Sequence, residues 1–156
     1  MTSPSASGQP PVANLQPLTR GRIEAALAAH DWTYHIDSDG GVCAYFDGNL
    51  FSFLREGPAQ QILYVRGRWH QPIPIEIRPQ LLLALDEWHL TRIWPKAFTW
   101  VDDDGKVWVH SEHSVDWGPG ATDAQIATTL ECSIFTSLAL YRHLAERFPI
   151  TVVPRL

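Results

Sequence analysis

The longest run of hydrophobic positions in the chain lies between residues 79 and 94, where it predicts a central helix. Pro79 suits a first helical turn, because its missing N–H costs nothing there, and Pro95 disfavours helical geometry at Trp94. At about 100° per residue the hydrophobic side chains fall on two stripes. The first stripe comprises Leu81, Ala84, Leu85 and Trp88, and the second comprises Leu82, Leu83, Leu90, Ile93 and Trp94. A helix that is apolar on two sides is buried on both. We therefore expect a sheet against the first stripe and this chain, a second copy or a partner over the second.

Short stretches of aromatic and β-branched residues, separated by Asp/Gly turns, surround this helix and predict strands. Four precede it, at residues 32–36, 42–46, 50–55 and 61–69, and two follow it, at residues 97–101 and 107–113. Because such short, turn-linked strands form meanders and hairpins, we expect antiparallel pairing.

Two further helices are predicted by their N-terminal capping residues. Thr19 is a favoured N-cap for a first helix that ends near His30, and Thr122 with Gln125 forms a capping box for a last helix that stops at Pro149. Small residues on the last helix are expected to pack on the alanine-rich first helix: Thr129, Cys132, Ser133, Thr136 and Ala139. The order of elements predicts an α+β fold, an antiparallel β-sheet packed with three main α-helices.

Composition places one domain at residues 18–156 after a disordered tail at residues 1–17, which carries four prolines and no charged side chain. The tail lacks the features of a secretory signal and no run suits a membrane span, so we expect a cytoplasmic protein without a membrane partner. A net charge of −5 argues against nucleic acid as the partner. Cys43 and Cys132 are expected to be reduced, although one disulfide is the open alternative.

Motifs of catalysis and metal binding are absent from the sequence. There is no Gly-x-Ser-x-Gly elbow, phosphate loop, dinucleotide fingerprint, His-Glu-x-x-His or Cys-x-x-Cys motif. His110 and His113 are three positions apart on a strand, which puts them on opposite faces. We therefore expect no catalytic residue, no cofactor and no metal, and hence a protein that is not an enzyme.

Candidate interaction residues lie on both sides of the central helix. Trp and Arg are frequent interface anchors, and the alternating strand pattern puts two arginines on one face and Trp69 on the other. Core packing of Trp69, with solvated or paired arginines, is the alternative. The protein-interaction candidates are Arg66, Arg68, Trp69, Leu82, Leu90, Ile93, Trp94 and Lys96.

An ordered set of short motifs resembles the YbjN family of bacterial proteins, over roughly residues 18 to 148. The matching pieces are Leu18-Thr19, Trp32-Thr33-Tyr34, the run from Phe46 to Phe51, the run from Arg66 to Trp69, Glu87-Trp88, the run from Arg92 to Lys96, and the run from Thr122 to Gln125. Relatives often have Asn where this chain has His70 and His89, which would alter a local hydrogen bond. The resemblance implies a fold like that of type III secretion chaperones and a sensory-transduction or stress-linked regulatory role. It supplies no catalytic residues.

The leading hypothesis is therefore a non-enzymatic, chaperone-like or regulatory module that binds another polypeptide, with a homodimer as a further expectation. The alternative is a small-ligand sensor that uses a cleft between helix and sheet. The third option is an enzyme whose site is assembled from residues distant in sequence.

Overall fold

The computed structural model describes residues 14–149. The helices are α1 (Arg20–Ala29), α2 (Arg78–Thr91) and α3 (Asp123–Arg147), and a 3-10 turn (Ile75–Ile77) precedes α2. The strands are β1 (His35–Ile36), β2 (Val42–Phe46), β3 (Asn49–Glu56), β4 (Ile62–Arg68), β5 (Ile73–Pro74), β6 (Lys96–Val101) and β7 (Lys106–Asp116). Within this part of the chain, no helix has the length and hydrophobicity needed to cross a membrane.

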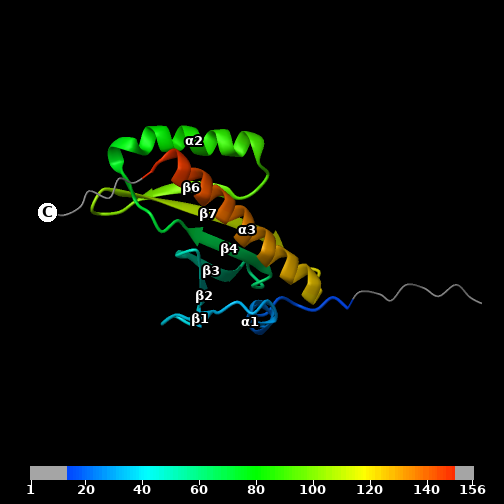
Figure 1. Cartoon of the computed structure of the whole chain (residues 1–156). Coiled ribbons are helices and arrows are strands. Elements are labelled where there is room, and N and C mark those ends of the chain that lie inside the picture. Colours follow the sequence, from blue (N-terminus) through cyan, green and yellow to red (C-terminus); the bar gives the residue numbers. More distant parts are fainter. Residues whose placement is uncertain (1–13, 150–156) are drawn as a thin grey trace, which may run out of the picture.

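The strands form one seven-stranded antiparallel sheet, as the sequence predicts. Strands β1 to β4 are a meander, and β4 pairs with β7, which also pairs with β5 and β6. Helix α3 crosses one face of this sheet, with α1 beside its first half and α2 beside its last turns (Figure 1). The fold is therefore α+β, with its helices gathered on one side of an antiparallel sheet.

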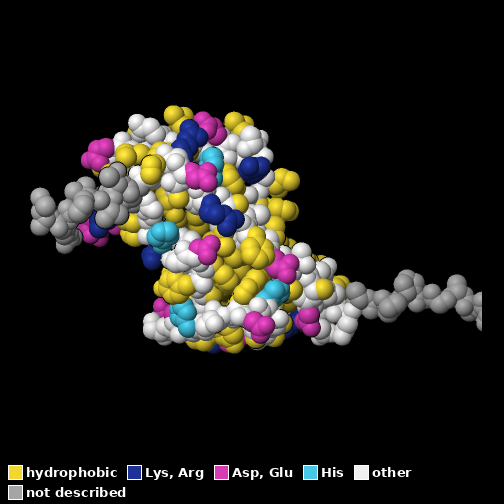
Figure 2. All heavy atoms as spheres, in the orientation of Figure 1, with side chains coloured by type: hydrophobic (Ala, Val, Ile, Leu, Met, Phe, Trp, Pro, Cys, Tyr) yellow, Lys and Arg dark blue, Asp and Glu magenta, His cyan; other side chains and the backbone are white. Residues whose placement is uncertain are grey.

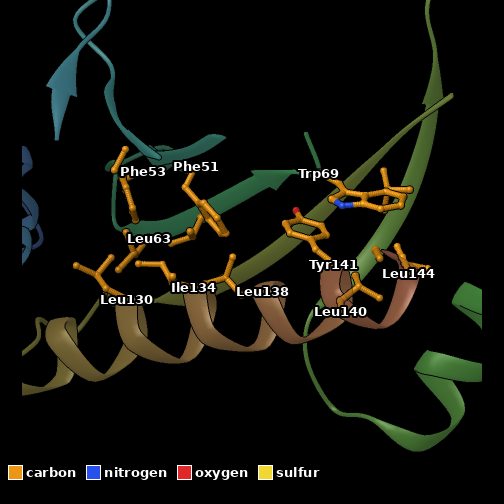
Figure 3. Close-up of a cluster of buried hydrophobic side chains, with 14 of the residues drawn as sticks. Phe51, Phe53, Leu63, Trp69, Leu130, Ile134, Leu138, Leu140, Tyr141 and Leu144 are labelled. Carbon is orange, nitrogen blue, oxygen red and sulfur yellow. The ribbon is translucent and has the colours of Figure 1, made fainter. Parts of the chain in front are cut away.

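The core lies between α3 and the inner face of the sheet. Leu130, Ile134 and Leu138 of α3 point toward the aromatic rings of Phe51 and Phe53 on β3 (Figure 3). Leu140, Tyr141 and Leu144, which follow Leu138 within two turns of α3, lie beneath the Trp69 ring (Figure 3). Side chains alternate in direction along each strand, so the apolar side chains of one face of the sheet point into the core. The opposite face of the sheet is left to solvent.

The two helix caps and the buried stripe that the sequence predicts are confirmed. Thr19 accepts a hydrogen bond from the Arg22 N–H at 3.2 Å, and Thr122 with Gln125 forms the expected capping box. The first stripe of the central helix is buried as a set: Leu81, Ala84, Leu85 and Trp88.

Several boundaries differ from the prediction. Helix α2 ends at Thr91 rather than Trp94, because Arg92 is already extended (φ −129°, ψ 140°) as the chain turns toward β6. The first strand keeps only two residues, since Trp32 stacks on His30 at a centroid distance of 4.3 Å instead of joining the sheet. Strand β5 was not predicted, because a strand of two residues is too short to show a pattern of alternating polar and apolar positions.

The expected disordered tail is partly wrong. Gln16 pairs with Ala121 through two backbone hydrogen bonds of 3.2 and 2.9 Å, and the Arg22 guanidinium donates to the carbonyl groups of Gln16 and Pro17. Residues 14–17 are therefore fixed against the start of α3. The rest of that prediction, residues 1–13, and residues 150–156 lie outside the described residues.

Candidate functional site

A groove of about 440 Å³ runs between α2 and α3 on the helical side of the molecule. Its α2 side is formed by Trp88 of the buried stripe and by Arg92 and Trp94, which follow the end of the helix. The groove is lined by Trp88, Arg92, Trp94, Thr136, Ala139, Arg142, His143 and Glu146. Thr136 and Ala139 belong to the row of small residues expected to pack on α1, so that expectation fails at these two positions.

Trp88 is the aromatic floor of this groove. The Arg92 guanidinium lies over its ring at 5.3 Å from the centroid, and the His143 ring lies 5.6 Å away at 42°. The indole N–H of Trp88 is buried and has no hydrogen-bond partner among the described residues. Such a buried donor is costly to leave unpaired.

An ion pair joins the two helices beside the groove. Arg147 near the end of α3 donates to the Glu87 carboxylate of α2, and this hydrogen bond lowers the pKa of Glu87. Both side chains are exposed, so the pair adds little to stability. It does occupy Arg147, which leaves Arg92 and Arg142 as the guanidinium groups that face the groove.

Exposed hydrophobic side chains lie along α2 and in the residues that follow it. Leu83, Leu90 and Ile93 are 61%, 85% and 84% exposed, and Leu82 and Trp94 also reach solvent. In Figure 2, hydrophobic surface lies over α2 and beside α3, with basic side chains among it. Because isolated apolar side chains are normal but clusters mark contact sites, this surface is the first candidate site.

Trp94 has a fixed position within this surface. Its ring stacks on His113 of β7 at a centroid distance of 5.2 Å and an interplanar angle of 20°. Burial lowers the pKa of His113, so the imidazole beneath Trp94 is neutral. The Trp94 ring is thus held partly open to solvent and preorganised for contact.

The remaining basic candidates lie on the other face of the sheet. Arg66 and Lys96 both bind Glu112 of β7, at 3.3 and 2.9 Å, and the Tyr64 hydroxyl also donates to this carboxylate. Burial alone would raise the pKa of Glu112, but these hydrogen bonds outweigh it and lower the pKa. Arg66 and Lys96 are therefore engaged in a cross-strand network.

Arg68 occupies the next row of this outer face. Its guanidinium lies over the Trp108 ring at 5.0 Å. His110, its cross-strand partner, stacks on Phe98 at 5.2 Å, and burial together with Arg66 and Arg68 lowers the pKa of His110 to about 4. His110 and His113 stack on opposite faces of the sheet, as their spacing predicts.

The predicted interaction residues therefore separate into two surfaces and one core residue. Leu82, Leu90, Ile93 and Trp94 lie on the helical side, whereas Arg66, Arg68 and Lys96 lie on the outer face of the sheet. Trp69 is only 1% exposed, so its assignment as an interaction residue is wrong. Its ring fills the space between the sheet and the end of α3, where an indole buries a large apolar area.

Sequence reasoning missed Arg92, Arg142 and His143 as groove residues. Arg142 and His143 are about fifty positions from Arg92, and no local pattern links two helices at that distance. Their only signal was a place on the polar side of the last helix. Among residues 14–149, no group of three or more His, Cys, Asp or Glu side chains is arranged to hold a metal ion.

The fold defines the class: an α+β protein with an antiparallel sheet and its helices on one face. The family model described as "YbjN: Putative bacterial sensory transduction regulator" matches residues 19–146, so the chain belongs to the YbjN family. The crystal structure of YbjN, "a putative transcription regulator from E. coli", is similar with a TM-score of 0.72 and 15% identity. The match covers 86% of this chain and 96% of that chain and supports the fold. No curated protein matches the chain.

His70 and His89, the two histidines singled out in the sequence, both contact neighbouring residues. His70 contacts Asn49 Oδ1 through its Nδ1 at 3.0 Å, and His89 Nε2 accepts the Ala97 N–H at 3.0 Å. Both rings make local hydrogen bonds at the ends of elements.

Proposed function

We propose that this protein is a non-enzymatic regulatory module that binds another polypeptide through its helical side. The observation that carries the proposal is the exposure of three large hydrophobic side chains on α2 and just after it, Leu83, Leu90 and Ile93. Full burial of one leucine or isoleucine contributes about 1.5–3 kcal/mol. Three such side chains with the Trp94 ring therefore supply a sizeable association energy.

The description of the family as a sensory transduction regulator supports this proposal. Contact with another protein is one way in which a regulator acts, and a chaperone-like action on a client chain is the related form. The two cysteines are free in the structure, a state that suits a reducing compartment such as the cytoplasm.

Substitution of Leu90 by Glu tests the proposal. Leu90 is 85% exposed, so Leu90→Glu should change the free energy of unfolding by less than about 0.5 kcal/mol. The matched variant Leu85→Glu, in the same helix, places a charge at a 3% exposed position and should unfold the domain. The partner is identified by co-purification and mass spectrometry and then titrated as a pure protein. Leu90→Glu and Ile93→Glu should abolish its binding.

A second copy of the chain is one partner that this surface can take. In that case light scattering should give a dimer for the native chain and a monomer for Leu90→Glu. A protein that stays monomeric and binds no purified partner through Leu90 or Ile93 would refute the proposed function.

The second candidate function is a small-ligand sensor. The groove volume of about 440 Å³ lies within the range of about 300–1,000 Å³ for ligand sites. A metabolite retained by the purified protein, and released by Arg142→Glu but not by Leu90→Glu, would favour this function over the first.

A further inference from the structure

We propose that the α2–α3 groove binds an acidic, amphipathic segment of a protein partner, whose carboxylates are held by Arg92 and Arg142. This inference rests on the proposed function, because it specifies the chemistry of the polypeptide that the helical side receives. It is carried by the charge of the groove, by the Arg92 guanidinium held over Trp88 and by the apolar residues in the lining.

The charge of the groove is opposite to that of the whole chain. The chain has a net charge of −5, yet the lining holds two guanidinium groups against one carboxylate, that of Glu146. Neither Arg92 nor Arg142 forms an ion pair within the described residues, whereas Arg147 on the same helix as Arg142 is paired with Glu87. Unpaired guanidinium groups bind carboxylates through parallel N–H donors.

The floor of the groove favours the same ligand. Arg92 lies over the Trp88 ring, which leaves the edge of the guanidinium available for hydrogen bonds. The Trp88 side chain, 6% exposed, forms part of the same lining, so Arg92 is held against an apolar surface. A carboxylate or peptide carbonyl of the bound segment would supply acceptors for the guanidinium donors.

The rim of the groove requires that the bound segment is apolar on one side. Trp94, which follows α2, and Ala139 of α3 both line the groove, and Trp94 is 46% exposed. Leu90 and Ile93 are exposed in the same stretch of chain, at the end of α2 and just before Trp94. Helix α2 has 14 residues and is about 21 Å long at 1.5 Å per residue. A segment of about twelve residues in helical form is about 18 Å long, slightly shorter than α2. It would carry hydrophobic residues on one face with Asp or Glu beside them.

The partner chemistry can be tested by selection from a random library of 12-residue peptides displayed on phage, against the immobilised full chain. Peptides that are enriched in Asp and Glu together with Leu, Ile, Phe or Trp are expected. Each is then synthesised with a fluorescent label and titrated by anisotropy. Arg92→Glu and Arg142→Glu should each weaken binding by about tenfold or more.

The matched control is Lys106→Glu, which makes the same charge change at the exposed start of β7, distant from the groove residues. It should leave binding within about twofold of wild type. Replacement of Asp and Glu in the peptide by Asn and Gln should reproduce the loss caused by the arginine variants. Arg92→Gln and Arg142→Gln, with thermal midpoints measured in parallel, guard against a folding defect.

Each other outcome overturns the inference in a recognisable way. Enriched peptides that are neutral or basic, or the absence of enriched peptides, would refute it. Peptides that need Leu90 and Ile93 but neither arginine would refute the acidic chemistry and leave the proposed function standing. Peptide binding that depends neither on the two arginines nor on Leu90 and Ile93 would refute both the acidic chemistry and the proposed function. If glutarate raises the thermal midpoint in an Arg142-dependent manner while no peptide binds, the groove is a site for small anions.

Discussion

The Tyr141 hydroxyl lies 2.7 Å from Ser111 Oγ, beneath the backbone of Gly67 on the neighbouring strand. Helix α3, strand β7 and strand β4 meet at this point, in a region without exposed surface. Burial raises the pKa of Tyr141, so the hydroxyl stays protonated and can share this hydrogen bond with Ser111. The close approach of the helix depends on the missing side chain of Gly67.

Gly67→Ala is therefore expected to destabilise the domain by about 1–3 kcal/mol. A Cβ at this position would lie 2.5 Å from the Tyr141 hydroxyl and would also crowd Phe51. The control is Gly21→Ala in α1, where a Cβ meets nothing within 4 Å and helix propensity favours Ala. Urea titration measures both, and equal stabilities for the two variants would contradict the packing argument.

His110 should make the domain less stable in mild acid. Its folded pKa of about 4 lies below the unfolded value of about 6.5, so the unfolded chain binds the proton first. Stability is thus full above pH 6.5 and is lost as the pH falls toward 4. With allowance for partial solvent screening, we expect a loss of the order of 1 kcal/mol at pH 5. His110→Gln should flatten this part of the curve of unfolding free energy against pH, and an unchanged slope would contradict the assignment.

His30 should have the opposite effect in a higher pH window. Its hydrogen bond to the Ala26 carbonyl and its contact with the Glu131 carboxylate raise the pKa of this histidine. The stabilisation is fully present below about pH 6.5 and is lost as the pH rises through the folded pKa. In His30→Gln, the decline of unfolding free energy above neutral pH should become smaller. An NMR titration of the imidazole that gives a pKa below 6.5 would exclude this account.

Both cysteines should react slowly and as free thiols. Cys43 is buried beside Asp37 and Ser52, Cys132 is partly buried on α3, and burial raises the pKa of both thiols. Thiolate is the nucleophile, so alkylation of the native protein by iodoacetamide should be slow. After denaturation, mass spectrometry should find two alkylated cysteines with or without reductant. A Cys43–Cys132 disulfide in protein from cytosol would refute the prediction.

The sequence predicted those parts of the fold that depend on neighbouring residues. Thr19 and Thr122 form caps with residues three positions away, and the stripe from Leu81 to Trp88 lies within about two turns of one helix. Such signals are complete within a short window. The α+β class and the antiparallel pairing follow from the order of the predicted helices and strands along the chain.

The groove could not be predicted in the same way. Arg92 and Arg142 come from different helices, and their meeting depends on the angle at which α2 and α3 pack. Trp69 shows the related difficulty: its type suits an interface or a core, and only the position of α3 decides between them. The end of α2 was also predicted too late, at Trp94 instead of Thr91.

The position of β7 between β4 and β6 bears on how the protein is made. The meander of β1 to β4 is complete at Arg68, but its open edge pairs with residues 110–116, and its apolar face is covered by α3. A ribosome must therefore release nearly the whole domain before the core can close. Until then the nascent chain carries an unpaired strand edge. Folding is thus delayed until the last helix emerges, rather than proceeding strand by strand during translation.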